Sequence, residues 1–358
     1  MNGSPVSESS MNGSNISAQL NLHPNDLGFV PHILPHQIRV WGPQVERIHV
    51  TLDTHGLASG HYRTEGMDEK LRAMRALLGD MVTEHPKLVV DEVDYSDAAR
   101  KRTARRWLDA DDLPVKAYNG SPIYAYLYGM AAVETDYVAH FDGDMLFGGG
   151  STTWASEAIA RLESDPQCVV VNPFPGPPRE DGEIYGHIGL RPVVDTPFSV
   201  PEREGEDMSY RAPFVSTRIL VTGIDLLRSR LGSNLRPTRP NVKERAYAHL
   251  IGAPTTSINL ERLLSLAITR SGCYRVDMLG SAPGMWSLHP LDRGPAFIAG
   301  LPALIEAVEN DALPNAQRGR YDIGTRGTGK DQRLPARMKR WSHYGVDYLK
   351  RQLGRRAA

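Results

Sequence analysis

Apolar residues recur along the chain in two patterns, short runs that are typical of strands and a 3.6-residue spacing that is typical of helices. Arg47–Thr54 predicts a first strand and Asp68–Thr83 a helix, with apolar side chains at positions 71, 74, 77, 78 and 81. Leu88–Asp94 predicts a second strand, and Ala98–Leu108 a second helix. Alternating strands and helices favour a parallel sheet with helices on its faces.

The same alternation continues through the middle of the chain. A helix is expected over residues 121–134, because it opens with a Ser cap and a Pro at the first helical position. It is followed by a strand at Tyr137–Phe147, a helix at Trp154–Ser164 and a strand at Cys168–Asn172. The sequence therefore predicts an α/β fold rather than separate blocks of helices and strands.

The second half of the chain is interrupted by one long irregular segment. Pro175–Met208 is acidic and rich in Pro and Gly, which suggests a functional loop near a binding site. Beyond it, Phe214–Leu231 predicts a strand followed by a helix, Asn259–Ser271 a helix, and Tyr274–Leu279 a strand. We expect a tail at residues 1–36, a folded domain at 37–315, and a Gly-rich, then basic, extension at 316–358.

Composition narrows the classes of partner. The formal charge of −1 and the pI of about 6.9 give no general electrostatic reason to expect a nucleic-acid partner. The basic C-terminal extension is compatible with peripheral contact with a membrane surface, or with a solvated helix face. The sequence shows neither a membrane span nor a secretion signal, so we expect a cytoplasmic protein, membrane-associated at most, with Cys168 and Cys273 as free thiols.

Two carboxylates at the end of an apolar run are the most informative feature of the sequence. Asp142 and Asp144 follow the predicted strand, separated by Gly143. On an extended segment, residues two apart point the same way, so both carboxylates can face one site. Hard oxygen ligands suit Mg²⁺ or Mn²⁺, ions that commonly also hold phosphates. Asp-Gly-Asp is also ordinary turn chemistry, and the tripeptide alone leaves both interpretations open.

Four separated segments, taken in order, carry a family resemblance. They are Asp53-Thr54 after the first strand, Val93–Asp97 after the second, Asn119 to Asp144, and the helix Asn259–Ser271 followed by Gly-Cys-Tyr-Arg-Val. In this order they resemble the GT-A fold glycosyltransferases, particularly the inverting enzymes of family 2. The resemblance implies a Rossmann-like, mixed, mostly parallel sheet flanked by helices.

The resemblance also implies roles for individual residues. Glu261 corresponds to the catalytic base, although Leu260 replaces the second acid of the usual pair. The metal ligands would be Asp142, Asp144 and His289. The donor contacts would be Asp53, Thr54, Asp94, Asn119 and Asp142. Asp53 and Asp94 could instead cap strand ends, and His289 could be a packed histidine.

The implied activity is transfer of a sugar from a nucleotide-diphosphate donor to an acceptor hydroxyl, with inversion and with Mn²⁺ or Mg²⁺ as cofactor. The acceptor, a saccharide, a lipid-linked molecule or a small metabolite, is not specified by the sequence. Two alternatives remain open. One is a sugar-phosphate nucleotidyltransferase, and the other is a non-catalytic nucleotide- or carbohydrate-binding relative, which the missing acid beside Glu261 would fit.

Overall fold

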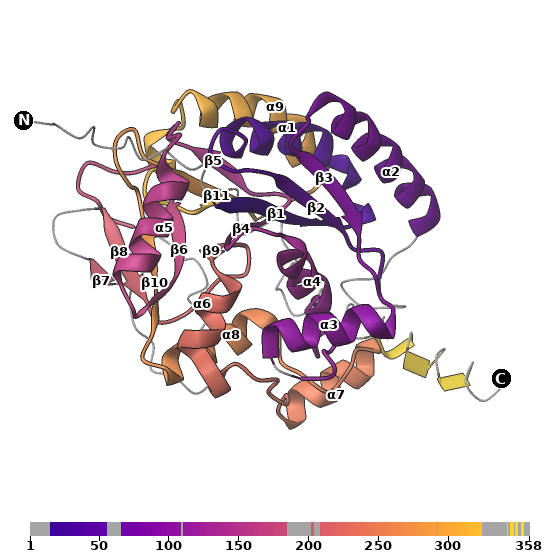
Figure 1. The fold of residues 1–358 in the computed structure, drawn as a ribbon. Helices are drawn as coiled ribbons and strands as arrows, with labels where there is room; N and C mark the ends of the chain where they lie inside the picture. The colour runs from indigo at the N-terminus through magenta and orange to yellow at the C-terminus, as the bar shows by residue number, and fades with distance from the viewer. Residues whose placement is uncertain are drawn as a thin grey trace, which may run out of the picture.

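One large mixed sheet crosses the molecule (Figure 1). The computed structural model describes residues 15–55, 66–108, 110–184, 202–203, 208–291 and 293–323, with a few residues between 342 and 353. Along the main path the strand order is β3-β2-β1-β4-β9-β6-β10-β8-β7, and β11 joins β5, β6 and β12 beside it. The strands are β1 Ile16–Leu22, β2 Ile48–Leu52, β3 Leu88–Glu92, β4 Tyr137–Asp142, β5 Leu146–Gly148, β6 Cys168–Pro175, β7 Glu202–Arg203, β8 Ser209–Ala212, β9 Ile219–Thr222, β10 Tyr274–Met278, β11 Trp286–Pro290 and β12 Asp322–Ile323.

Among the described strands of the main path, parallel and antiparallel neighbours are equally frequent, with four pairs of each. Strand β1 pairs in parallel with both β2 and β4, β2 pairs in parallel with β3, and β6 pairs in parallel with β10. Strand β9 is antiparallel to β4 and β6, and β8 is antiparallel to β10 and β7. Beside this path, β11 is parallel to β6 and β12 and antiparallel to β5, so six of the eleven described pairs are parallel. The predicted mixed, mostly parallel sheet is therefore confirmed.

Helices cover both faces of this sheet (Figure 1). Their apolar side chains form two buried clusters, one with α1, α2, α5 and α9 and the other with α3, α4, α6 and α8. The α-helices are α1 Val30–Trp41, α2 Met67–Glu84, α3 Asp97–Leu108, α4 Tyr124–Ala132, α5 Trp154–Ser164, α6 Ile224–Leu231, α7 Val242–Ile251, α8 Leu260–Arg270 and α9 Pro295–Glu309. Short 3₁₀ helices lie at η1 Pro24–Gly28, η2 Gly232–Asn234 and η3 Asn315–Gln317. In the described part of the chain, no helix is long and apolar enough to cross a membrane.

The sheet begins earlier in the chain than predicted. Ile16–Leu22, placed by the sequence in a tail ending at residue 36, is the strand β1 between β2 and β4, and α1 follows it. This strand alternates apolar residues with Ser17, Gln19 and Asn21, and the polar positions made it resemble a hydrophilic tail. Ser17 and Gln19 are nevertheless buried, because α4 packs on β1. The predicted tail boundary is wrong, and residues 1–14 lie outside the described residues.

The predicted boundary at residue 316 is also too early. Tyr321 is completely buried and β12 pairs with β11, so this stretch packs on the sheet as part of the domain. Most of the basic extension and most of the predicted loop Pro175–Met208 lie outside the described residues. Both cysteines are free and buried, as the sequence predicts.

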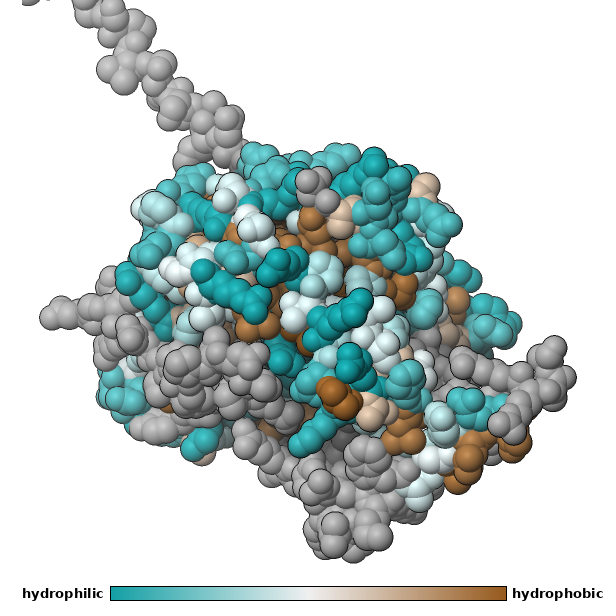
Figure 2. All heavy atoms as spheres, turned by 90° about the horizontal axis from the view of Figure 1, so that it is seen from below, coloured by the Kyte–Doolittle hydropathy of each residue, from teal (hydrophilic) through white to brown (hydrophobic). Residues whose placement is uncertain are grey.

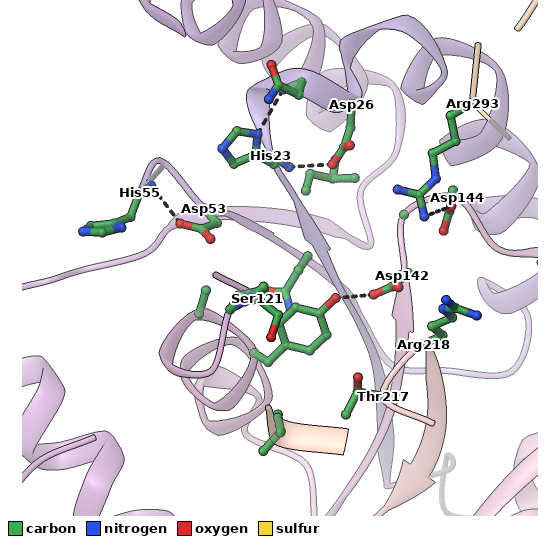
Figure 3. A pocket seen from close by; sticks show the side chains of 18 of the residues that line it. His23, Asp26, Asp53, His55, Ser121, Asp142, Asp144, Thr217, Arg218 and Arg293 are labelled. Atoms are coloured by element: carbon green, nitrogen blue, oxygen red, sulfur yellow. Dashed lines mark hydrogen bonds and ion pairs between the residues drawn. The ribbon is translucent and has the colours of Figure 1, made fainter. Parts of the chain in front are cut away.

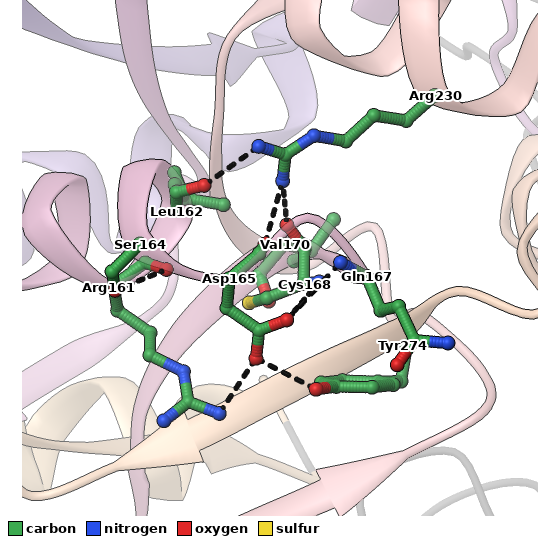
Figure 4. A network of polar contacts seen from close by, with 9 residues as sticks. All are labelled: Arg161, Leu162, Ser164, Asp165, Gln167, Cys168, Val170, Arg230 and Tyr274. Carbon is green, nitrogen blue, oxygen red and sulfur yellow. Dashed lines mark hydrogen bonds and ion pairs between the residues drawn. The ribbon is translucent and has the colours of Figure 1, made fainter.

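A polar network fixes the start of β6 at the edge of the sheet away from the carboxyl ends (Figure 4). The carboxylate of Asp165 accepts hydrogen bonds from the Tyr274 hydroxyl at 2.6 Å and from Arg161 at 2.9 Å. Arg230 donates to the carbonyl oxygens of Leu162 at 2.8 Å and Asp165 at 3.0 Å. Helices α5 and α6 are thereby tied to the N-terminal ends of β6 and β10.

Candidate active site

A cavity of about 600 Å³ lies at the carboxyl ends of β1, β2 and β4. Parallel strands end at the same edge of a sheet, and ligands of open α/β sheets bind in the crevice outside that edge. The turn before β9, the start of α8 and the start of α9 complete the walls. Its described polar and charged lining residues are Asn21, His23, Asn25, Asp26, Asp53, His55, Lys116, Asn119, Ser121, Tyr126, Asp142, Asp144, Thr217, Arg218, Asn259, Glu261 and Arg293.

The two predicted metal carboxylates both face this cavity (Figure 3). Asp142 is the last residue of β4 and accepts a hydrogen bond from the Tyr126 hydroxyl. Burial and the adjacent charge of Asp144 raise the pKa of Asp142. Between them, a Cβ at Gly143 would lie 2.3 Å from Leu22 Cδ2, so a side chain there would require the buried Leu22 side chain to shift. The close approach of β1 to this turn therefore explains the glycine of the motif.

Asp144 is almost fully buried, at 1% exposure. Arg293, two residues before α9, forms an ion pair with its carboxylate, although no hydrogen bond of regular geometry reaches either carboxylate oxygen. A buried carboxylate without hydrogen bonds is costly unless a cation compensates it. Asp144 is therefore built to hold a positive charge.

The donor set fits a divalent cation that shares its coordination with a ligand. Mg²⁺ is commonly held by one or two carboxylates together with phosphate oxygens and waters. Asp142 and Asp144 supply two hard oxygen ligands next to open space. Among the described residues, no group of three His, Cys, Asp or Glu side chains is arranged to hold a metal by itself. The site thus suits a cation that arrives with a phosphorylated ligand.

His289 does not join these carboxylates. It is 4% exposed on β11 and is not among the residues that line the cavity. Its Nδ1 lies 3.1 Å from Asp322 Oδ1 and 3.4 Å from Arg218 Nη1, and its ring stacks on Tyr321 at 5.8 Å. This geometry corresponds to the alternative of a packed histidine, because β12 pairs with β11 at this position and Tyr321 and Asp322 contact the imidazole ring. We therefore leave His289 out of the candidate metal site.

Glu261 lines the cavity from the first turn of α8. Asn259 caps this helix by accepting a hydrogen bond from the Arg262 N–H at 3.1 Å, which fixes the direction of the turn. Burial raises the pKa of Glu261, and the charge of Arg218 partly opposes that shift. Leu260, which replaces the second acid of the family pair, is a buried core residue. A single carboxylate with a raised pKa thus faces the space beyond Asp142.

Asp53 is held in a buried ion pair at the end of β2. Its Oδ2 lies 2.9 Å from Lys116 Nζ, and Oδ1 accepts from the Tyr95 hydroxyl at 2.5 Å and from the His55 N–H at 2.8 Å. Burial opposes ionisation, but Lys116 and these hydrogen bonds outweigh it and lower the pKa of Asp53. The carboxylate is ionised and fixed, with Lys116 beside it in the wall of the cavity.

The remaining predicted donor contacts divide into two groups. Asn119 lines the cavity, and its Oδ1 accepts hydrogen bonds from the Ser121 N–H at 3.1 Å and hydroxyl at 2.7 Å. Thr54 and Asp94 are not among the described lining residues. The Asp94 side chain is exposed and accepts from the Ser96 N–H at 2.8 Å, as a strand-end cap would. Its strand, β3, is at the outer edge of the sheet, away from the β1–β4 centre.

Sequence reasoning missed several residues of the cavity. Arg218 and Arg293 lie in loops and Lys116 lies before α4, and none of them forms a periodic or motif signal. Asp26 belongs to η1, inside the predicted tail, and accepts from the His23 N–H at 2.8 Å. Burial raises the pKa of Asp26 to about 7. Figure 3 shows Asp26, Asp142 and Asp144 around one side of the cavity, with Arg293 beside Asp144.

Comparisons with known proteins show similarity at the level of the fold. A scan against protein-family models finds no match, and no curated protein matches by sequence. Among solved structures, the chain is similar to GalNAc-T7 with UDP, GalNAc and Mn²⁺, at a TM-score of 0.45 and 11% identity, over 76% of this chain and 43% of the other. It is also similar to LgtC, at a TM-score of 0.37 and 10% identity, over 92% of this chain and 95% of the other.

A third similar structure is glucosyl-3-phosphoglycerate synthase from Mycobacterium tuberculosis, at a TM-score of 0.31 and 13% identity, over 82% of this chain and 76% of the other. The chain spans less than half the length of GalNAc-T7. These similarities concern only the general arrangement of strands and helices. The chemistry of the site depends on the chain's own residues.

Proposed function

We propose that this protein is a metal-dependent glycosyltransferase that moves a sugar from a nucleotide-diphosphate donor to an acceptor hydroxyl with inversion. The observation that carries the proposal is that one cavity collects Asp53, Asn119, Asp142, Asp144 and Glu261. These residues come from three of the four separated segments that carry the family resemblance, and these three segments are far apart in the sequence. A chance cluster of surface turns would not bring them to one edge of the sheet.

Each side chain then has a defined task. Asp53, Lys116 and Asn119 line the part of the cavity at the end of β2 and the start of α4, where they can bind the nucleoside through hydrogen bonds. Asp142 and Asp144 would hold the divalent cation, which supplies Lewis-acid stabilisation to the departing diphosphate. Arg218 adds positive charge on the side of Glu261.

Glu261 is the proposed general base. It takes the proton of the acceptor hydroxyl while the hydroxyl oxygen bonds to the anomeric carbon and the bond from that carbon to the phosphate oxygen breaks. The nucleoside diphosphate leaves on the opposite face, which gives inversion. The raised pKa of Glu261 makes its carboxylate a stronger base than an exposed glutamate.

The test is turnover with a panel of UDP-, GDP- and TDP-sugars and Mn²⁺, with released nucleoside diphosphate as the readout. We expect at least one donor to be hydrolysed or transferred, and Asp144→Asn to abolish this while leaving the fold intact. Asp80→Asn on the exposed face of α2 is the matched control, since it also removes one carboxylate. Equal loss of folded protein and activity in Asp144→Asn would assign the residue a structural role.

The same experiment separates the alternatives. Binding of a nucleotide sugar without release of nucleoside diphosphate under any condition would identify a non-catalytic binding protein. Release of pyrophosphate from a nucleoside triphosphate and a sugar phosphate would identify a nucleotidyltransferase. Either outcome would replace the proposed activity.

We also propose peripheral contact between the C-terminus and an anionic membrane surface. Val346, Leu349 and Leu353 are exposed apolar residues at helical spacing, at 49%, 59% and 66% exposure, in a sequence rich in Lys and Arg. The face of the molecule in Figure 2 is largely hydrophilic, with groups of hydrophobic side chains in its middle and at its lower right. Co-sedimentation with phosphatidylserine vesicles, reduced by salt and lost in Leu349→Ser/Leu353→Ser, would support contact. Equal binding to neutral vesicles would contradict it.

A further inference from the structure

Arg293 contacts the carboxylate of Asp144, which would bind a metal ion in the proposed function. Its guanidinium forms an ion pair with Asp144, whose side chain is 2% exposed, whereas the Arg293 side chain is 46% exposed. Asp26 and Asp142 also interact electrostatically with Arg293. The cationic end of an otherwise accessible side chain is therefore drawn into a group of three carboxylates.

The Asp144 carboxylate cannot bind two neighbouring cations equally strongly, because the two cations repel each other. Among the residues that the structure describes, no side chain or backbone group donates a regular hydrogen bond to the carboxylate oxygens of Asp144, so Arg293 is its compensating charge in this structure. A divalent ion bound to Asp144 would lie close to the guanidinium and be repelled by it. Arg293 must then move, and its accessible side chain leaves it free to do so.

We propose that Arg293 is an internal counter-ion that competes with the divalent cation for Asp144 and is released to the donor diphosphate when metal and nucleotide bind together. This inference rests on the proposed function. A guanidinium is suited to both positions, because its planar donors match carboxylate and phosphate oxygens alike. Metal alone must displace Arg293 without compensation, whereas metal with a diphosphate offers Arg293 a new anionic partner.

The competition makes metal and nucleotide binding cooperative. Each ligand removes part of the cost of binding the other, and this coupling is reciprocal. Removing the guanidinium should therefore strengthen binding of the metal alone and weaken its coupling to a nucleoside diphosphate. Such opposite changes distinguish a competing counter-ion from a residue that only stabilises the cavity, which would weaken both.

The experiment is a titration of free Mn²⁺ by electron paramagnetic resonance, with the whole chain as wild type and as Arg293→Met, in the absence and presence of UDP or GDP. We expect Arg293→Met to bind Mn²⁺ alone about fivefold more tightly, at the low end of typical coupling because Arg293 is partly exposed. The enhancement of Mn²⁺ affinity by the nucleotide should shrink by a similar factor. Arg293→Lys should lie between the two.

Arg75→Met is the matched control, because Arg75 forms an ion pair with Glu92 at 2.5 Å and is 51% exposed. It removes one positive charge and should leave Mn²⁺ binding unchanged. Equal Mn²⁺ affinity of wild type and Arg293→Met, with the nucleotide enhancement intact in both, would overturn the counter-ion role and leave the proposed function standing. Absence of Mn²⁺ binding from both proteins, even with UDP and GDP, would overturn the proposed metal site as well.

Discussion

Replacing Lys116 by Met tests the buried ion pair in the wall of the cavity at the end of β2. Lys116 and Asp53 are 4% and 7% exposed at their side chains, and Lys116 Nζ lies 2.9 Å from Asp53 Oδ2. Methionine keeps the length and apolar stem of the side chain but removes the cation. Asp53 is then left as a buried carboxylate whose remaining donors, the Tyr95 hydroxyl and the His55 N–H, both reach Oδ1.

The expected loss follows from what remains around Asp53. Removing one partner of a buried ion pair typically costs about 3 to 5 kcal/mol, and the two surviving hydrogen bonds favour the lower value, about 3 kcal/mol at pH 7. In the wild type the pKa of Asp53 is lowered, so its contribution is present above the unfolded pKa and is lost as pH falls through the folded pKa. In Lys116→Met burial acts without the cation and raises the Asp53 pKa, so the penalty disappears as protons bind at acid pH.

The free energy of unfolding, measured by urea titration at pH 7 and near pH 4, checks both the size of the predicted loss and the direction of its change with pH. The difference between wild type and Lys116→Met should be larger at pH 7. Lys101→Met is the control, since Lys101 is half exposed and lies 3.6 Å from Asp111. A loss of unfolding free energy below about 1 kcal/mol, or a loss that grows toward acid pH, would refute the reasoning. In a double-mutant cycle, Asp53→Asn should remove most of the effect of Lys116→Met.

Three further outcomes are expected. Removing divalent ions with EDTA should abolish release of nucleoside diphosphate, and added Mn²⁺ should restore it. Burial raises the pKa of Glu261, so the rate should rise with pH through that raised pKa. Glu261→Gln should lose this pH dependence together with the activity, while donor binding, measured by calorimetry, should remain. Gly148→Ala should lower the unfolding free energy by about 1 to 3 kcal/mol in thermal unfolding, because its Cβ would lie 2.1 Å from the buried ring of Trp286.

The fold could be predicted from the sequence wherever apolar residues form uninterrupted runs. Such runs coincide with strands β2, β3, β4, β6 and β10, and the predicted helices coincide with most of the helices between them. Strand β1 was missed because its pattern alternates and its polar side chains are buried inside the molecule. Gln19, for example, donates to Thr51 Oγ1 at 3.0 Å, a partner that lies on another strand and that the local sequence does not identify. Tertiary contacts, rather than local propensity, decide such a segment.

The site divides in the same way. Asp142 and Asp144 stand at the end of a strand and could be found from their spacing, and Glu261 from its place before the Gly-Cys-Tyr-Arg-Val stretch. Thr54, Asp94 and His289 were selected by the same resemblance, but they are not among the described lining residues. A motif fixes where a residue lies along the chain and cannot fix which way the end of its strand faces in the sheet. The cations were missed because loops carry no periodicity.

The distribution of charge in the cavity argues for a cation from outside the chain. The described lining residues include five carboxylates, Asp26, Asp53, Asp142, Asp144 and Glu261, and only three permanently cationic side chains, Lys116, Arg218 and Arg293. Lys116 pairs with Asp53 and Arg293 pairs with Asp144, so Asp26, Asp142 and Glu261 have no ion pair of their own among the lining cations and interact with Arg218 or Arg293 only at longer range. Burial is the largest cause of the raised pKa values of these three acids, and the nearby cations oppose it only in part. A divalent ion at Asp142 and Asp144 would balance the excess of carboxylates in the cavity. By displacing Arg293 from Asp144, it would also make that guanidinium available to the incoming diphosphate.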